Sequence, residues 1–148
     1  MNTKVAILGK LPTKFKAPFD NPEWDIWTLN RHIDCEKLPR VDLWFDIHAR
    51  GVYEKANITR ENYPFKEAEG LAGGQYFNNS ISYMIAYAIL NGYKEIALYG
   101  MRFTTDNEHR RGEYTNVREW IFYCKGRGIK VTAPVDAVML KEYALYGV

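Results

Sequence analysis

The chain has 148 residues, of which 47% are hydrophobic and 26% are charged, a size and composition typical of one globular domain with one core. The net charge is +2 and no long run of Lys or Arg occurs, so there is no strong nucleic-acid signal. Two distant cysteines, Cys35 and Cys124, argue against a disulfide framework or a cysteine metal site, and no apolar run approaches the ~20 residues of a membrane span or forms a signal peptide. We therefore expect a cytoplasmic protein with no membrane partner, no metal and no cofactor.

The first part of the chain predicts three strands, over residues 5–8, 24–29 and 41–47. Each is a short apolar or alternating run that ends at a turn residue, which is typical of strands in a parallel sheet. Residues 10–23, between the first two strands, carry three of the six prolines and predict a loop rather than a helix.

The middle of the chain contains the clearest helix. Residues 80–91 are apolar almost all round, which indicates a helix that packs on a sheet and is covered again. Asn91-Gly92 should end this helix, and residues 95–99 predict a fourth strand. Before the helix the pattern is less clear and is compatible with short helices near 49–56 and 64–69.

The last part predicts a loop over residues 101–112, an amphipathic helix over 114–125 and a fifth strand over 129–132. Pro134 should start a short helical tail. Alternating strands and helices without an internal repeat predict one α/β domain over residues 1–148. We expect a single Rossmann-like domain, a mostly parallel sheet of about five strands flanked by helices.

Ligands of open parallel sheets bind outside the carboxyl ends of the strands. Polar residues follow the predicted strands, and Asn79 and Ser80 begin the long helix, whose free N–H groups suit a phosphate. An equally simple interpretation is that Asn79 and Ser80 are plain helix caps. Neither a GxGxxG fingerprint nor a P-loop is present.

Three side chains are candidates for acid–base chemistry: His32, His48 and Glu113. Both histidines follow predicted strands, and histidine is the commonest general base. Each has a plainer interpretation, since a lone histidine is often structural and Glu113 could favour the helix dipole or accept from a ribose hydroxyl. Aromatic residues make up 15% of the chain, and their rings could fill the core or stack on a base.

The order of these motifs resembles bacterial family-42 sialyltransferases and related Rossmann proteins of the 6-hydroxymethylpterin pyrophosphokinase type. The resemblance is carried by residues 5–13, Trp27-Thr-Leu-Asn30, Leu43-Trp-Phe45 and, most specifically, the block 79–100 that ends in Gly-Tyr-Lys-Glu-Ile-Ala-Leu-Tyr-Gly. Small phage proteins have a similar layout, including a Glu-Tyr pair like Glu113-Tyr114, so the cell would be the host cell if the chain is phage-encoded.

The resemblance implies a nucleotide held by the first turn, by the Asn after the second strand and by the start of the long helix. Carried over, these positions are Gly9, Pro12, Thr13, Asn30, Asn79 and Ser80. The chain departs from the family pattern at Leu11 and Ile81, where the family has glycine, and the family's late catalytic histidine and lid have no clear match.

These observations predict binding of a nucleotide-type small molecule, with Gly100, Arg102 and Tyr114 as further ligand-binding residues at the same edge of the sheet. The first hypothesis is a transferase or hydrolase acting on a nucleotide or nucleotide-linked substrate, with His32, His48 or Glu113 as acid or base. The second is a non-catalytic protein that sequesters a nucleotide signal of a defence system, which predicts an unchanged ligand and a homo-oligomer that completes the pocket. The third is a structural interaction module.

Overall fold

The computed structural model describes residues 2–101, 107–133 and 147. The strands of its sheet are β1 (Lys4–Leu8), β2 (Trp24–Leu29), β3 (Leu43–Asp46), β4 (Ile58–Thr59), β5 (Glu95–Tyr99) and β6 (Lys130–Thr132). They form one sheet in the order β4-β3-β2-β1-β5-β6, and every neighbouring pair is parallel. The predicted Rossmann-like α/β fold is confirmed, with a sixth strand that was not expected because β4 has only two residues.

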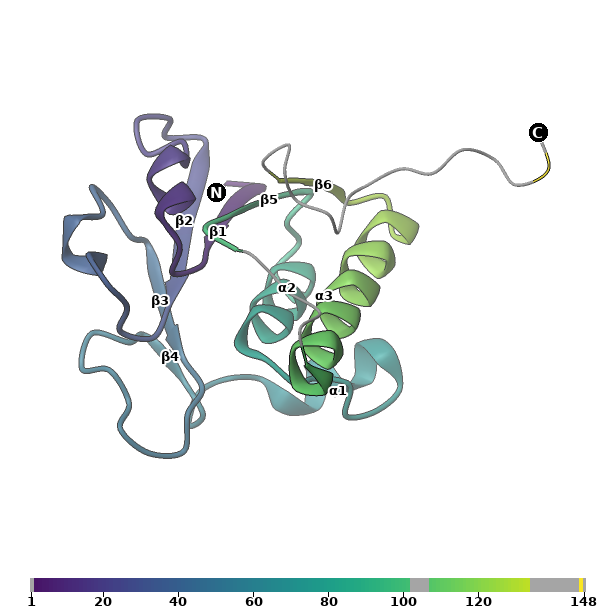
Figure 1. Cartoon of the computed structure of the whole chain (residues 1–148). Helices are drawn as coiled ribbons and strands as arrows, with labels where there is room; N and C mark the ends of the chain where they lie inside the picture. Colours follow the sequence, from purple (N-terminus) through teal and green to yellow (C-terminus); the bar gives the residue numbers. More distant parts are fainter. Residues whose placement is uncertain (1, 102–106, 134–146, 148) are drawn as a thin grey trace.

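Three helices cover one face of this sheet: α1 (Phe65–Ala72), α2 (Ser80–Leu90) and α3 (Glu108–Gly126) (Figure 1). The alternation along β1 divides the core between the two faces. Val5 and Ile7 pack with the helices, whereas Ala6 and Leu8 face a smaller cluster on the other side. That smaller cluster is closed by the segments around two short 3₁₀ helices, η1 (Pro12–Lys16) and η2 (Cys35–Lys37).

Several predicted elements are corrected by the structure. The suggested helix near 49–56 does not form, because Asp46 accepts a hydrogen bond from the Tyr53 backbone and holds this segment in a turn. The predicted loop 10–23 contains η1, which a proline opens. Helix α3 starts at Glu108, six residues before the predicted start at residue 114, because Asn107 accepts from the backbone N–H of Arg110 at 2.9 Å and caps it. The helical tail expected from Pro134 lies outside the described residues.

The order of the strands reverses between β1 and β5. From β1 the chain moves outward through β2, β3 and β4, then crosses to β5 and β6 on the other side of β1. Gly9 and Gly100 follow these two central strands, and their backbones pack closely against each other. Gly100 has φ 70°, and a Cβ added there would lie 2.8 Å from the carbonyl oxygen of Gly9. Only glycine fits both positions, so the two turns pack closely and form a floor at the switch point of the sheet.

Candidate functional site

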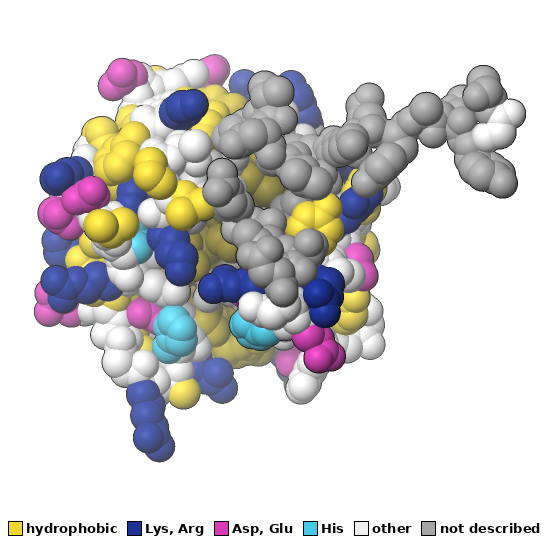
Figure 2. Space-filling model, viewed as in Figure 1, with side chains coloured by type: hydrophobic (Ala, Val, Ile, Leu, Met, Phe, Trp, Pro, Cys, Tyr) yellow, Lys and Arg dark blue, Asp and Glu magenta, His cyan; other side chains and the backbone are white. Residues whose placement is uncertain are grey.

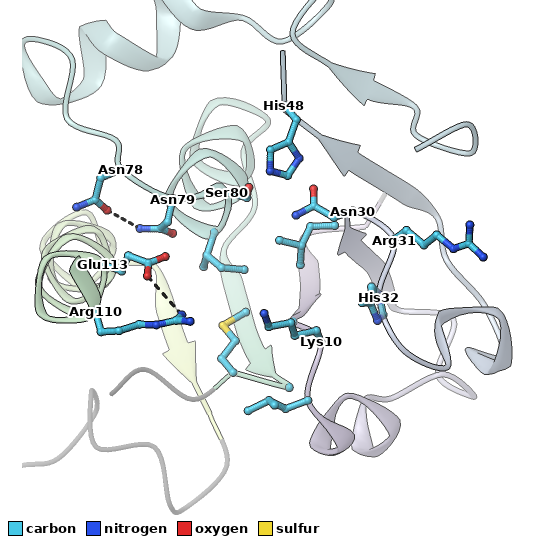
Figure 3. Close-up of a pocket in the computed structure, with 16 residues that line it drawn as sticks. Lys10, Asn30, Arg31, His32, His48, Asn78, Asn79, Ser80, Arg110 and Glu113 are labelled. Carbon is cyan, nitrogen blue, oxygen red and sulfur yellow. Dashed lines mark hydrogen bonds and ion pairs between the residues drawn. The ribbon is translucent and has the colours of Figure 1, made fainter. Parts of the chain in front are cut away.

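A pocket of about 450 Å³ opens above this floor, within the size range of ligand sites (Figure 3). Its lining residues lie at or after the ends of β1, β2, β3 and β5, or at or just before the starts of α2 and α3: Gly9, Lys10, Leu11, Leu29, Asn30, Arg31, His32, His48, Asn78, Asn79, Ser80, Ile81, Gly100, Met101, Arg110 and Glu113. We call it the switch-point pocket. On the face drawn in Figure 2, hydrophobic side chains lie at the bottom of a hollow with Lys, Arg and His side chains around it.

The N-terminus of α2 is aimed at this pocket. Asn79 caps the helix, because its Oδ1 accepts from the backbone N–H of Ser82 at 3.1 Å. The N–H groups of Ser80 and Ile81 belong to the first turn of α2, where no helical carbonyl precedes them to accept a hydrogen bond. Both residues line the pocket, which therefore lies at the positive end of the helix dipole.

A buried asparagine on α3 fixes the approach to this helix. Asn116 accepts through Oδ1 from the backbone N–H of Asn78 at 3.3 Å and from the Asn79 side chain at 3.2 Å. Its own amide donates to the carbonyl of Tyr76 at 3.2 Å, and the Trp120 indole donates to the same carbonyl at 2.8 Å. The sequence prediction missed Asn116; the signal is a polar amide on the apolar face of an amphipathic helix.

Asn30 holds a fixed position between β2 and β3. Its backbone N–H donates to Phe45 at 2.7 Å, and its carbonyl accepts from the Trp44 indole at 2.7 Å, with φ 51° in the left-handed region. Its side chain faces the cavity in Figure 3, and among the described residues nothing hydrogen-bonds to its buried Oδ1. Asn30 therefore offers a free acceptor to a ligand.

His32 belongs to a buried hydrogen-bond chain that starts at Lys14. The ammonium of Lys14, which is 1% exposed, contacts Nδ1 of His32 at 2.8 Å and also donates to the carbonyls of Lys10 and Ile33. The hydroxyl of Thr28 donates to the carbonyl of Leu8, so Nε2 of His32, 3.0 Å from that hydroxyl, must be the donor of their shared bond.

Both ring nitrogens of His32 are thus occupied, and the tautomer with the proton on Nε2 follows from the donors around it. Burial and the nearby charge of Lys14 lower the pKa of His32 to about 4. Burial also lowers the pKa of Lys14. His32 lines the switch-point pocket, but this arrangement favours a structural role for it over the predicted role as acid or base.

His48 is arranged differently. Its Nδ1 lies 2.7 Å from Oδ1 of Asp46, a carboxylate that is 3% exposed. Because a carboxylate only accepts, Nδ1 carries a proton, and in the neutral imidazole Nε2 is then the acceptor. The side chain of His48 is 59% exposed and points toward the cavity (Figure 3). Of the two histidines predicted as acid–base residues, His48 is the one whose second ring nitrogen, Nε2, has no hydrogen bond from the described residues.

Glu113 lies on the opposite wall, in the second turn of α3. Its Oε1 is 3.5 Å from the Arg110 guanidinium and 3.3 Å from the imidazole of His109. Arg110 also lines the pocket. With Lys10 and Arg31 the pocket holds three fixed cations and one carboxylate, so its charge balance favours an anionic ligand.

Three of the predicted ligand residues do not line the switch-point pocket. Thr13 supports its floor, because its hydroxyl accepts from the Gly100 backbone N–H at 2.8 Å. Pro12 opens η1, and Tyr114 packs against the main core. Arg102 lies outside the described residues. The other predicted ligand residues, namely Gly9, Asn30, Asn79, Ser80 and Gly100, are brought together there.

The described residues contain neither a candidate membrane span nor a candidate metal site. No helix among them is both long and apolar enough to cross a membrane. Within the same residues, no group of three or more His, Cys, Asp or Glu side chains is placed to hold a metal ion.

Comparison with known proteins supports the fold. No family model and no curated protein matches the chain. Among solved structures, the chain matches the sialyltransferase CST-II, determined in complex with a trisaccharide acceptor and CMP. The TM-score is 0.55 at 16% identity, over 92% of this chain and 83% of that one. At this level of identity the match shows the fold alone: the chain has a sialyltransferase-like, Rossmann-like α/β fold.

Proposed function

We propose that the switch-point pocket binds the phosphate of a nucleotide-type ligand. The observation that carries this proposal is the convergence of the α2 N-terminus with the fixed cations Lys10 and Arg110 on one pocket. Backbone N–H groups at a helix N-terminus together with basic side chains are a recurrent way to hold a phosphate. Arg31 adds positive charge at the rim.

The rest of a nucleotide would be recognised by polar groups and not by aromatic stacking. The free Oδ1 of Asn30 suits a hydroxyl or amino donor, and Glu113 on the opposite wall suits the hydroxyls of a ribose. No Tyr or Trp is among the lining residues of the pocket in the described part of the chain. The high aromatic content serves mainly the core, where Trp27 and Trp120 are almost fully buried.

For the chemistry, we propose a transferase that uses a nucleotide-linked donor. The fold match supports this proposal, because the matched sialyltransferase structure contains CMP together with an acceptor. His48 would be the acid or base, since it lines the pocket and Asp46 holds Nδ1, which leaves Nε2 without a hydrogen bond from the described residues.

A second function, sequestration of a nucleotide without chemistry, is favoured by a different observation. Of the three predicted acid–base groups, His32 has both ring nitrogens engaged and Glu113 lies beside two basic side chains. A pocket built chiefly to hold an anion needs no proton-transfer group. In that case the ligand leaves the protein unchanged.

The test incubates the protein with nucleoside monophosphates, cyclic nucleotides, NAD-derived molecules and nucleotide sugars. Thermal shift identifies binders, and each sample is then denatured and its ligand examined by chromatography. A stabilising ligand converted to a new product supports the transferase or hydrolase. Recovery of an unchanged stabilising ligand, with and without added sugar or alcohol, supports sequestration. No shift and no product across the panel would overturn the nucleotide proposal.

A further inference from the structure

A second pocket adjoins the switch-point pocket on the side of β3. Its volume is about 390 Å³, and its remaining wall is the loop between β3 and β4, including Tyr53 and Glu54. The two pockets share Asn30, Arg31 and His48. A ligand in either pocket would therefore meet His48 at the common wall.

The charges of the two pockets differ. The switch-point pocket has an excess of cations, whereas the second pocket contains Arg31 together with the carboxylates Asp46 and Glu54. Asp46 is buried and its oxygens are taken by His48 and by the Tyr53 backbone, so Glu54 is the carboxylate open to a ligand. The second pocket thus offers a cationic hydrogen-bond donor and an anionic acceptor. This combination suits a neutral compound that is rich in hydroxyl groups, not a second phosphate.

The loop that forms this pocket is fixed by the same carboxylate that orients His48. Oδ1 of Asp46 accepts from the backbone N–H of His48 at 3.1 Å and from its Nδ1 at 2.7 Å, and Oδ2 accepts from the Tyr53 N–H at 2.8 Å. The Tyr53 ring packs against the Trp44 ring in a tilted arrangement, with the ring centroids 5.0 Å apart. One buried group thus sets both the tautomer of the imidazole and the position of the pocket wall.

We propose that this second pocket is the subsite of a hydroxyl-bearing acceptor, and that Asp46 is a positioning residue that keeps Nε2 of His48 ready to take the acceptor's proton. The inference rests on the proposed function, a nucleotide-linked donor in the switch-point pocket. The acceptor oxygen bonds to the transferred group as His48 takes its proton. The bond between that group and the donor phosphate breaks, the phosphate keeps the electron pair, and His48 later releases the proton to water.

The first test maps binding by NMR with two probes, CMP and methyl glucoside. CMP should shift the backbone signals of Ser80 and Gly100, and methyl glucoside those of Val52 and Tyr53. If CMP shifts its signals but methyl glucoside leaves the loop of the second pocket unchanged, the acceptor subsite is wrong while the nucleotide site stands. If CMP shifts no signal, both proposals fail.

A matched pair of variants checks the second pocket. Glu54→Gln should weaken methyl glucoside binding several-fold, whereas Glu61→Gln, an exposed glutamate outside both pockets, should leave it unchanged. Equal affinities for the two variants and the unmodified protein would contradict a role of Glu54 in acceptor binding.

The role of Asp46 has a readout of its own. Nitrogen NMR of the histidine rings should show His48 with the proton on Nδ1, and Asp46→Asn should lose this preference, because one amide oxygen cannot replace two acceptors. Asp42→Asn is the control, since Asp42 also accepts from a backbone N–H, that of Ile26 at 2.7 Å, but contacts no histidine. An unchanged tautomer in Asp46→Asn would overturn the positioning role even if the variant is less stable.

Discussion

The ammonium of Lys14 lies 2.8 Å from Nδ1 of His32; Lys14 is buried, and His32 is partly buried. This pair joins η1 to the end of β2 beneath the switch-point pocket. A cation that donates to an unprotonated imidazole nitrogen requires the histidine to be neutral, which agrees with the lowered pKa of His32.

This pair predicts acid sensitivity with a defined sign. The pKa of His32 falls from an ordinary 6.5 to about 4 in the folded protein, so between these values the unfolded chain binds more protons. The free energy of unfolding contributed by His32 is therefore complete above about pH 6.5 and is lost as the pH falls toward about 4. Urea unfolding across this window should show the loss.

Replacing the histidine isolates its share of that loss. In His32→Ala the free energy of unfolding should be lower at neutral pH, because Lys14 loses an acceptor, and should depend less on pH across the window. His109→Ala is the matched control, since the His109 side chain is 77% exposed. A His32→Ala variant as pH-dependent as the unmodified protein would contradict the assignment.

The contact between Gly9 and Gly100 predicts a large effect of one methyl group. In Gly100→Ala the new Cβ would approach the Gly9 carbonyl at 2.8 Å in a left-handed backbone conformation, so we expect a loss of roughly 2–4 kcal/mol in unfolding free energy. Gly92 has a similar φ of 79° but open space around it. Gly92→Ala should therefore cost only about 1–2 kcal/mol. Chemical denaturation compares the two, and equal losses would show that the close contact is unimportant.

The buried amide of Asn116 predicts a linked loss of stability and binding. Asn116→Ala leaves the Asn78 N–H and the Asn79 side chain without their acceptor, which should cost about 1–3 kcal/mol. Nucleotide affinity should fall as well, because the start of α2 loses its support. Thr115→Ala, at the exposed neighbouring position, should change the unfolding free energy by no more than about 0.5 kcal/mol. Nucleotide affinity is measured by calorimetry. An unchanged affinity in Asn116→Ala would show that Asn116 does not support the nucleotide site.

The cation at Lys10 predicts a loss of binding without a loss of stability. Its side chain is exposed and lines the pocket, so Lys10→Gln should weaken binding of a nucleoside monophosphate about tenfold, equivalent to about 1.4 kcal/mol. The effect should shrink at high salt, because exposed charges are screened. Lys16→Gln, on η1 and outside the pocket, is the control. Equal weakening in both variants would indicate nonspecific attraction.

Much of this site could be predicted because parallel strands deliver their last residues to one edge. The ends of β1 and β5 and the cap of α2 follow from short apolar runs and from Asn79, so Gly9, Gly100 and Ser80 were placed at the same edge. The distinction between the two histidines could not be predicted. It depends on which buried partner reaches each ring: Lys14 comes from a 3₁₀ helix hidden in a proline-rich loop, whereas Asp46 lies two residues before His48.

The elements that escaped prediction are those fixed by single long-range contacts. Strand β4 has two residues and gives no periodicity, and it exists because Asn57 pairs with Trp44 through both its backbone and its side chain. The early start of α3 depends on the Asn107 cap inside a polar stretch. Arg110 is brought to the pocket only by that extra turn.

The measurement that tests the central claim most directly is a crystal structure of the protein grown with CMP. The account predicts density for the phosphate within hydrogen-bonding distance of the backbone N–H groups of Ser80 and Ile81, close to Lys10. CMP bound elsewhere on the surface, or a phosphate turned away from the start of α2, would contradict it.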